Sequence, residues 1–167
     1  MTYQVKYNTN DCKHLLELLI YIIDNKQITV DDFIEVTGLS DKIYGTTMRD
    51  FNQMLPKLDL NISSLKSTVL IPKEPQNKVI YYYNVDITDP YKYNIDNLTQ
   101  EELIKYSLVI VYLMLKNEQY VTPITLSRIF PNFNNKTMFY LKENLLDVIA
   151  DDIEKNKYQS YILVDFD

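Results

Sequence analysis

One short stretch of the chain gathers side chains that can read the edges of base pairs. It contains five such residues: Thr46, Thr47, Arg49, Asn52 and Gln53. An arginine can form two hydrogen bonds with guanine, and an asparagine or glutamine amide can do the same with adenine. The apolar residues between them recur with the spacing of a buried helix face. The pattern predicts a helix over residues 46–58 whose outer side fits a DNA groove.

A second stretch, 90 positions further along the chain, repeats this pattern. Met48, Phe51, Leu55 and Leu58 correspond to Met138, Leu141, Leu145 and Val148. The same core spacing predicts the same helix-packing role. The outward residues of the second helix include four candidates for nucleic-acid contact: Lys136, Thr137, Tyr140 and Lys142.

Each of these helices is followed by a segment that we interpret as a β-hairpin. The first hairpin has strands over 68–71 and 79–85, and its loop carries Lys73 and Lys78. The second has its tip at 154–157, with Lys155 and Lys157, before a strand over 158–166. Lysines at a hairpin tip can contact phosphates as a DNA-binding wing. A tip that is polar only because it is solvated would look the same.

Two further helices are expected before each of the repeated ones. In the first half they cover 11–25 and 30–36, and Thr29 caps the second of them. In the second half they cover 101–116 and 123–129, and Thr99 and Thr122 are the caps. Helix, helix, helix, hairpin is the order of a winged helix-turn-helix. The predicted fold is therefore mainly α with small β-hairpins (α+β), a tandem winged helix-turn-helix with modules at 1–87 and 98–167 and a linker at 88–97.

The predicted helix Glu101–Lys116 is apolar on nearly every side. Such a helix needs cover on several faces, which either the first module or a second copy of the chain can supply. A homodimer through this helix would also match a palindromic operator, because paired recognition helices meet successive major grooves.

Composition argues against several classes of protein. His14 is the only histidine and Cys12 the only cysteine, which excludes an intramolecular disulfide and gives no basis for an enzyme, a metal site or a cofactor. The chain has no apolar run long enough for a membrane span and no signal-peptide core, so a cytoplasmic location is expected. Abundant Asn, Lys, Ile and Tyr indicate a low-GC bacterium or its phage.

Several short motifs of the first module also follow a known pattern. Ser40, Thr46 and the pair Arg49-Asp50 precede a leucine-bearing helix, and the hairpin ends in Tyr81-Tyr82-Tyr83. With Leu98-Thr99-Gln100-Glu101-Glu102 further on, this order resembles the helix-turn-helix of DeoR-like and WYL-domain bacterial transcription regulators. The turn is longer than in that family, and a WYL domain itself is not present. The resemblance implies DNA binding through the third helix, with Thr47 and Arg49 at recognition positions.

These observations favour a sequence-specific, DNA-binding transcription regulator. The net charge of −6 points the other way, because nucleic-acid binders are usually basic. The alternative is an acidic winged-helix adaptor that docks a protein partner, like an antirepressor or a subunit of a chromosome-segregation complex. A positive stripe over the third helices would favour DNA, and a uniformly negative face would favour the adaptor.

Overall fold

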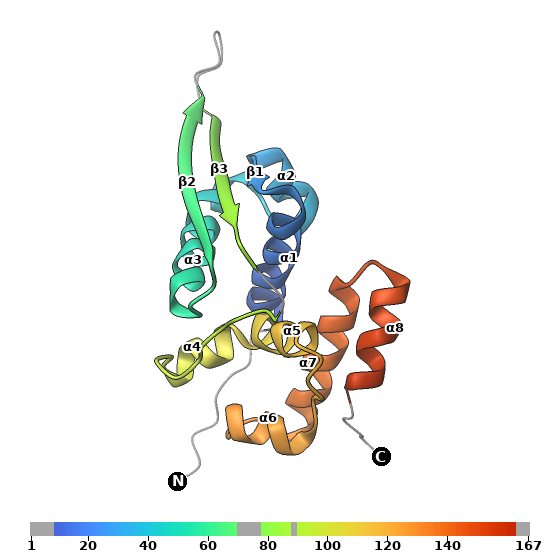
Figure 1. The fold of residues 1–167 in the computed structure, drawn as a ribbon. Coiled ribbons are helices and arrows are strands. Elements are labelled where there is room, and N and C mark those ends of the chain that lie inside the picture. The colour runs from blue at the N-terminus through green and yellow to red at the C-terminus, as the bar shows by residue number, and fades with distance from the viewer. Residues whose placement is uncertain (1–8, 70–77, 88–89, 163–167) are drawn as a thin grey trace. The chain divides into compact units, whose positions relative to one another are not determined.

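The computed structural model describes residues 9–69, 78–87 and 90–162 (Figure 1). Its contacts divide the chain into two compact units. The first, which we call the winged unit, comprises residues 17–88 and 92–95. The second, the helical unit, comprises residues 1–16, 89–91 and 96–167. Helix α1 (Thr9–Asn25) contributes residues to both units.

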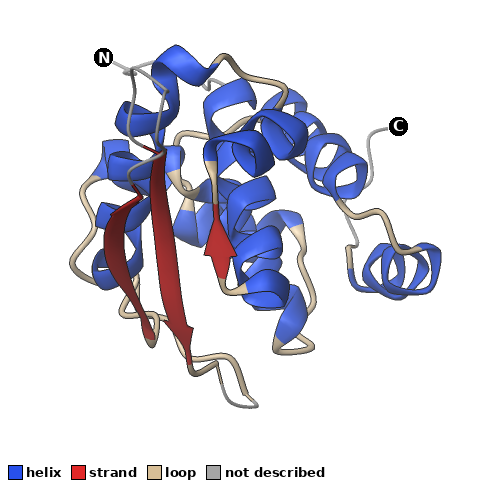
Figure 2. Ribbon diagram, turned by 90° about the horizontal axis from the view of Figure 1, so that it is seen from above, coloured by secondary structure: helices blue, strands red, loops and turns tan. Residues whose placement is uncertain are grey.

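The winged unit has the predicted order of a winged helix-turn-helix. After α1 come β1 (Gln27–Ile28), α2 (Val30–Thr37), the 3-10 turn η1 (Asp41–Ile43), α3 (Tyr44–Lys57), β2 (Ile62–Val69) and β3 (Lys78–Val85). The three strands form an antiparallel sheet in the order β1-β3-β2, drawn red in Figure 2. The prediction of a helix-turn-helix with a hairpin in the first half of the chain is confirmed.

The two helices of the motif begin and end at local signals. Thr29 accepts a hydrogen bond from the Asp32 amide at 3.2 Å, and the Asp32 carboxylate accepts one from the Thr29 amide at 3.0 Å. This capping box starts α2, and Gly38 ends it with a left-handed φ of 72°. Helix α3 begins at Tyr44, two residues before the predicted start, so Gly45 lies in its first turn. There the flexibility of glycine weakens a helix less than it would in the interior.

Strand β2 also differs from the sequence prediction. It begins at Ile62 rather than at residue 68. Its eight residues pair with β3 in continuous register, from Ile62 opposite Val85 to Val69 opposite Lys78. Lys78, expected in the loop, is the first residue of β3. The segment 70–77, which contains Lys73, lies outside the described residues.

Apolar and aromatic side chains hold α3 against the sheet. Phe51 and Tyr83 meet edge to face with ring centroids 6.0 Å apart, and Phe33 meets Tyr44 in the same way at 5.2 Å. Tyr81 and Tyr83 are buried, whereas Tyr82 between them is 40% exposed. This alternation is the expected pleat of a strand with one buried face.

Besides the first half of α1, the helical unit contains five helices in its described part: α4 (Gln100–Lys105), α5 (Ser107–Lys116), α6 (Pro123–Ile129), α7 (Asn135–Val148) and α8 (Asp152–Tyr161). The single helix predicted over 101–116 is wrong, because Tyr106 separates α4 from α5. At this break the Cys12 thiol donates to the Ile104 carbonyl at 3.1 Å. The predicted burial is confirmed, since every residue from Ser107 to Leu115 is buried within the single chain.

The predicted second hairpin is wrong. Glu154, Lys155 and Lys157 lie on α8, and the Asp151 side chain caps this helix by accepting from the Glu154 amide at 2.9 Å. An N-cap aspartate followed by acids in the first turn is a helix start, and it prevails over a hairpin here. In the described part of this unit, β pairing is limited to one bridge between Val121 and Ile162. A second winged helix is therefore not evident, although α6 and α7 keep a helix-turn-helix order.

Candidate nucleic-acid interface

The exposed residues of α3 form a single stripe along the helix. Thr46, Arg49, Gln53 and Lys57 follow one another at intervals of three and four residues, and all four are exposed. Side chains at these intervals lie on one face of a helix. The opposite face carries the buried Met48, Phe51 and Leu55. We call these four residues the α3 stripe.

The other two predicted contact residues of α3 lie beside the stripe. Thr47 and Asn52 are half-buried, one on each flank. The Tyr83 hydroxyl donates to the Asn52 amide oxygen at 2.6 Å. This bond fastens the middle of α3 to strand β3, so the side chain of Asn52 helps to position the helix. Burial raises the pKa of Tyr83 above its usual range, so the phenol keeps the proton that it donates.

The first turn of α3 is fastened to the sheet as well. The buried Tyr44 hydroxyl lies 3.2 Å from the Ile28 carbonyl oxygen of β1 and 3.1 Å from the Val79 carbonyl oxygen of β3. Burial is the main cause that raises the pKa of Tyr44, and the neighbouring Tyr81 adds to it. Together, Tyr44 and Tyr83 hold the α3 stripe in a fixed orientation relative to the hairpin.

The hairpin adds exposed residues of two kinds. Lys66 on β2 is exposed and basic. On the outer face of the sheet, Leu65 pairs with Tyr82 in register, and these side chains are 69% and 40% exposed. Of the predicted wing lysines, Lys73 and the side chain of Lys78 lie outside the described part.

Sequence reasoning missed Lys57 and Lys66 as candidates. Lys57 lies within the predicted helix over 46–58, and the spacing Arg49, Gln53, Lys57 was the available signal for it. Lys66 was overlooked because β2 was expected to begin two residues after it. The segment Ile62–Val69 does not alternate polar and apolar residues, so its sequence carries no period-two signal for a strand that begins at Ile62.

Acidic residues lie close by in the chain. Asp31 and Asp32 occupy the first turn of α2, with Glu35 one turn later. Asp32 is used in the capping box, whereas Asp31 and Glu35 are exposed. Such charges repel phosphates. Any DNA contact of this motif therefore depends on α3 and the hairpin rather than on α2.

The residues predicted for the second site are not gathered in the same way. On α7, Lys136 Nζ lies 5.7 Å from the centre of the exposed Tyr140 ring. The Thr137 amide and hydroxyl both donate to the capping Asn134 oxygen, at 2.8 and 2.9 Å. Lys142 and Lys155 are half-buried. Lys157 forms an ion pair with Glu118 at 3.4 Å.

Other kinds of site receive no support in the described part of the chain. No group of three or more His, Cys, Asp or Glu side chains is placed to hold a metal ion there. Cys12 is the only cysteine in the sequence and could ligate a metal only together with His14, the only histidine. Its side chain is buried, with 2% exposure. None of the described helices has the length and apolar character needed to cross a membrane.

Comparison with known protein families gives a match that covers the first part of α1 and most of the winged unit. Residues 5–84 match the family described as the Mga helix-turn-helix domain, a domain of bacterial transcription regulators. No curated protein and no solved structure matches the chain. The match supports the predicted class, a DNA-binding helix-turn-helix of a bacterial transcription regulator, but it does not show the predicted resemblance to DeoR-like and WYL regulators.

Proposed function

We propose that this protein is a sequence-specific DNA-binding transcription regulator that reads the major groove with the α3 stripe. The observation that carries this proposal is the exposed row Thr46, Arg49, Gln53 and Lys57, which lies directly opposite the buried face of the helix. The match of residues 5–84 to a helix-turn-helix domain supports it.

Each residue of the α3 stripe has a role that follows from its chemistry. Arg49 bonds a guanine edge, and Gln53, one turn further along, bonds an adenine edge. Thr46 and Lys57 contact phosphates on either side and set the register. Thr47, which the DeoR-like resemblance implies as a reader, and Asn52 lie at the flanks and complete the surface. The hairpin acts as the wing through Lys66, Lys73 and Lys78.

The helical unit contributes a second, weaker contact in this proposal. Lys136, Thr137, Tyr140 and Lys142 on α7 are its candidate residues. Lys155 and Lys157 are left out because they lie on α8 rather than at a hairpin tip. Because α5 is already buried within one chain, a homodimer does not need that helix as its interface.

Selection from random-sequence DNA tests the proposal. The chain should enrich a defined sequence, and Gln53→Ala should relax the preference at one adenine position while leaving the other positions unchanged. Arg128→Ala, an exposed substitution on α6, is the control and should enrich the same sequence as the parent. Failure of the folded parent chain to enrich any sequence would contradict the proposal.

The adaptor function remains the second candidate because of one feature of the hairpin. The exposed pair Leu65 and Tyr82 offers an apolar surface on a chain whose net charge is −6. Central positions of protein interfaces are rich in aromatic residues and poor in charge. If the adaptor function is the right one, the chain enriches no DNA and Gln53→Ala has no effect on partner binding, whereas Tyr82→Ala weakens it.

A further inference from the structure

A polar cavity lies in the helical unit, away from the α3 stripe in the sequence. It has a volume of about 400 Å³ and is bounded by residues 90–91, the end of α5 and the middle of α8. Its wall includes Tyr91, Lys116, Asn117, Glu118, Lys157 and Tyr158. The volume lies at the lower end of the range of small-molecule sites, which span roughly 300–1,000 Å³.

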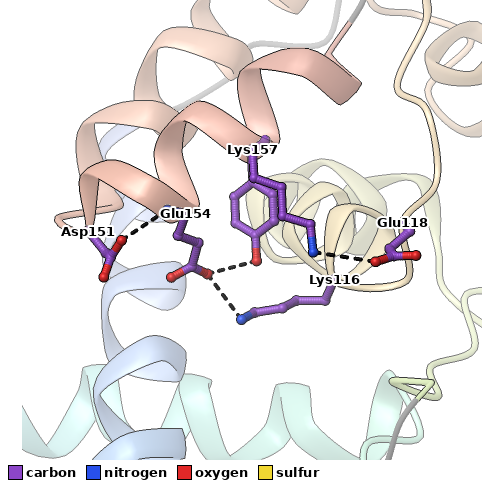
Figure 3. Close-up of polar contacts among 6 residues, drawn as sticks. Lys116, Glu118, Asp151, Glu154 and Lys157 are labelled. Carbon is purple, nitrogen blue, oxygen red and sulfur yellow. Dashed lines mark hydrogen bonds and ion pairs between the residues drawn. The ribbon is translucent and has the colours of Figure 1, made fainter.

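Lys116 lines this cavity and makes several contacts of its own. Its ammonium group forms an ion pair with Glu154 at 3.0 Å, and the Tyr158 hydroxyl donates to the same carboxylate at 2.7 Å (Figure 3). The ammonium also lies 5.4–5.9 Å from the ring centres of Tyr91, Tyr112 and Tyr158. These contacts fix a positive charge in one place.

The other two charges of the wall are held loosely. Lys157 and Glu118 lie 3.4 Å apart, and their side chains are 51% and 64% exposed (Figure 3). An exposed pair at this distance contributes little to stability, so each partner can exchange the other for a ligand group at small cost. The wall thus offers one exchangeable cation beside one exchangeable anion.

Asn117, at the end of α5, connects this helix to residue 91 at the wall of the cavity. Its amide nitrogen donates to the Tyr91 carbonyl, but its buried Oδ1 has no hydrogen-bond partner in the described structure. A buried acceptor without a donor is unfavourable, and natural structures usually satisfy it with protein, water or ligand.

We propose that this cavity binds a small zwitterion, a free α-amino acid. The ligand carboxylate replaces Glu118 as the partner of Lys157, in the positive field of Lys116. The ligand ammonium pairs with Glu118. The rings of Tyr91 and Tyr158 contact the ligand side chain. A simple anion would meet the Glu118 carboxylate and a simple cation would meet Lys157, whereas a zwitterion satisfies both and adds no net charge.

The residue Glu118 allows a sharp test, because its backbone has a left-handed φ of 58°. Glycine adopts that conformation readily, so Glu118→Gly removes the carboxylate without straining the end of α5. Lys157→Gln removes the exchangeable cation. Lys136→Gln, at an exposed position of α7, is the matched control for loss of one lysine charge.

The experiment is isothermal titration of the full chain with each of the twenty standard amino acids, up to about 10 mM. At least one should show saturable one-site binding, weakened at least about tenfold by Glu118→Gly and by Lys157→Gln but not by Lys136→Gln. The N-acetyl derivative and the amide of the same amino acid should each bind at least about tenfold more weakly. The proposal would be overturned if no amino acid showed saturable binding. It would also be overturned if the Glu118→Gly variant bound the amino acid as tightly as the parent chain does, or if the parent chain bound the N-acetyl derivative as tightly as the amino acid itself. The proposal does not depend on DNA binding.

Discussion

Replacing Tyr44 by phenylalanine removes the hydroxyl that fastens the start of α3 to two strands. The ring is 5% exposed, and phenylalanine would keep its contacts with Phe33 and Tyr81, whose ring centres lie 5.2 and 5.8 Å away. The change therefore isolates the hydrogen bonds to the carbonyl oxygens of Ile28 and Val79, at 3.2 and 3.1 Å.

The size of the effect follows from the number of hydrogen bonds that the Tyr44 hydroxyl can donate. One hydroxyl has one hydrogen, so it cannot donate fully to both carbonyls. Its loss is worth about one hydrogen bond together with the cost of a buried carbonyl left unpaired, roughly 1–2 kcal/mol in the free energy of unfolding. For a chain of 167 residues, each kcal/mol corresponds to about 2–4 °C in Tm. The Tm of the chain should therefore fall by about 2–8 °C.

Differential scanning calorimetry and urea unfolding measure this change. Tyr82→Phe is the control, because Tyr82 lies on the same sheet with a 40% exposed side chain and should change the stability by less than about 0.5 kcal/mol. Equal stabilities of the Tyr44→Phe variant and the parent would refute the idea that this hydroxyl fastens α3.

Three further outcomes are expected. Val109→Asp places a charge in a fully buried position of α5 and should lower the free energy of unfolding by at least about 3 kcal/mol, so that circular dichroism shows an unfolded chain. Ile124→Asp, at a 65% exposed position, is the control and should leave the chain folded. A folded Val109→Asp variant would show that α5 is exposed. Burial raises the pKa of Tyr44, Tyr83 and Tyr158 in the folded state, so these tyrosines add no pH dependence to the stability below about pH 10. Above it the stability should fall by up to about 1.4 kcal/mol per pH unit for each of them, because only the unfolded chain releases those protons. Urea midpoints that do not change between about pH 10 and about pH 11 would contradict this. Lys26→Gly should raise the free energy of unfolding by about 0.5–1 kcal/mol, because Lys26 has a left-handed φ of 61° that glycine adopts more readily. Glu35→Gly, inside α2, is the control and should lower the free energy of unfolding by about 1 kcal/mol. A Lys26→Gly variant that is less stable than the parent would show that the left-handed turn is unstrained.

Features encoded by neighbouring residues were predicted well from the sequence. The start of α2 after Thr29 and the start of α6 after Thr122 each depend on side chains within a few positions of one another. The core spacing of α3 likewise places its exposed residues by helix geometry alone. For this reason Thr46, Arg49 and Gln53 could be grouped as one surface before the structure was known.

The remaining features depend on contacts between distant residues or on competing signals. The break at Tyr106 lies beside a contact between Ile104 and Cys12, 92 positions apart in the chain. The bond that engages Asn52 comes from Tyr83, 31 positions away. At residues 154–157, the repeat suggested a second hairpin, but the local cap at Asp151 indicated the helix that forms. The cavity joins residue 91 to α5 and α8, and no spacing in the sequence indicates it.

The most direct test of DNA reading by α3 is the affinity of Arg49→Ala for the DNA sequence that the parent chain selects, measured by fluorescence anisotropy at about 50 and 200 mM salt. We predict a loss of about 1–3 kcal/mol in binding free energy for that sequence, roughly 5- to 150-fold in Kd, with a much smaller loss for unrelated DNA. An Arg49→Ala variant that is folded and binds the selected sequence as tightly as the parent would contradict the central claim.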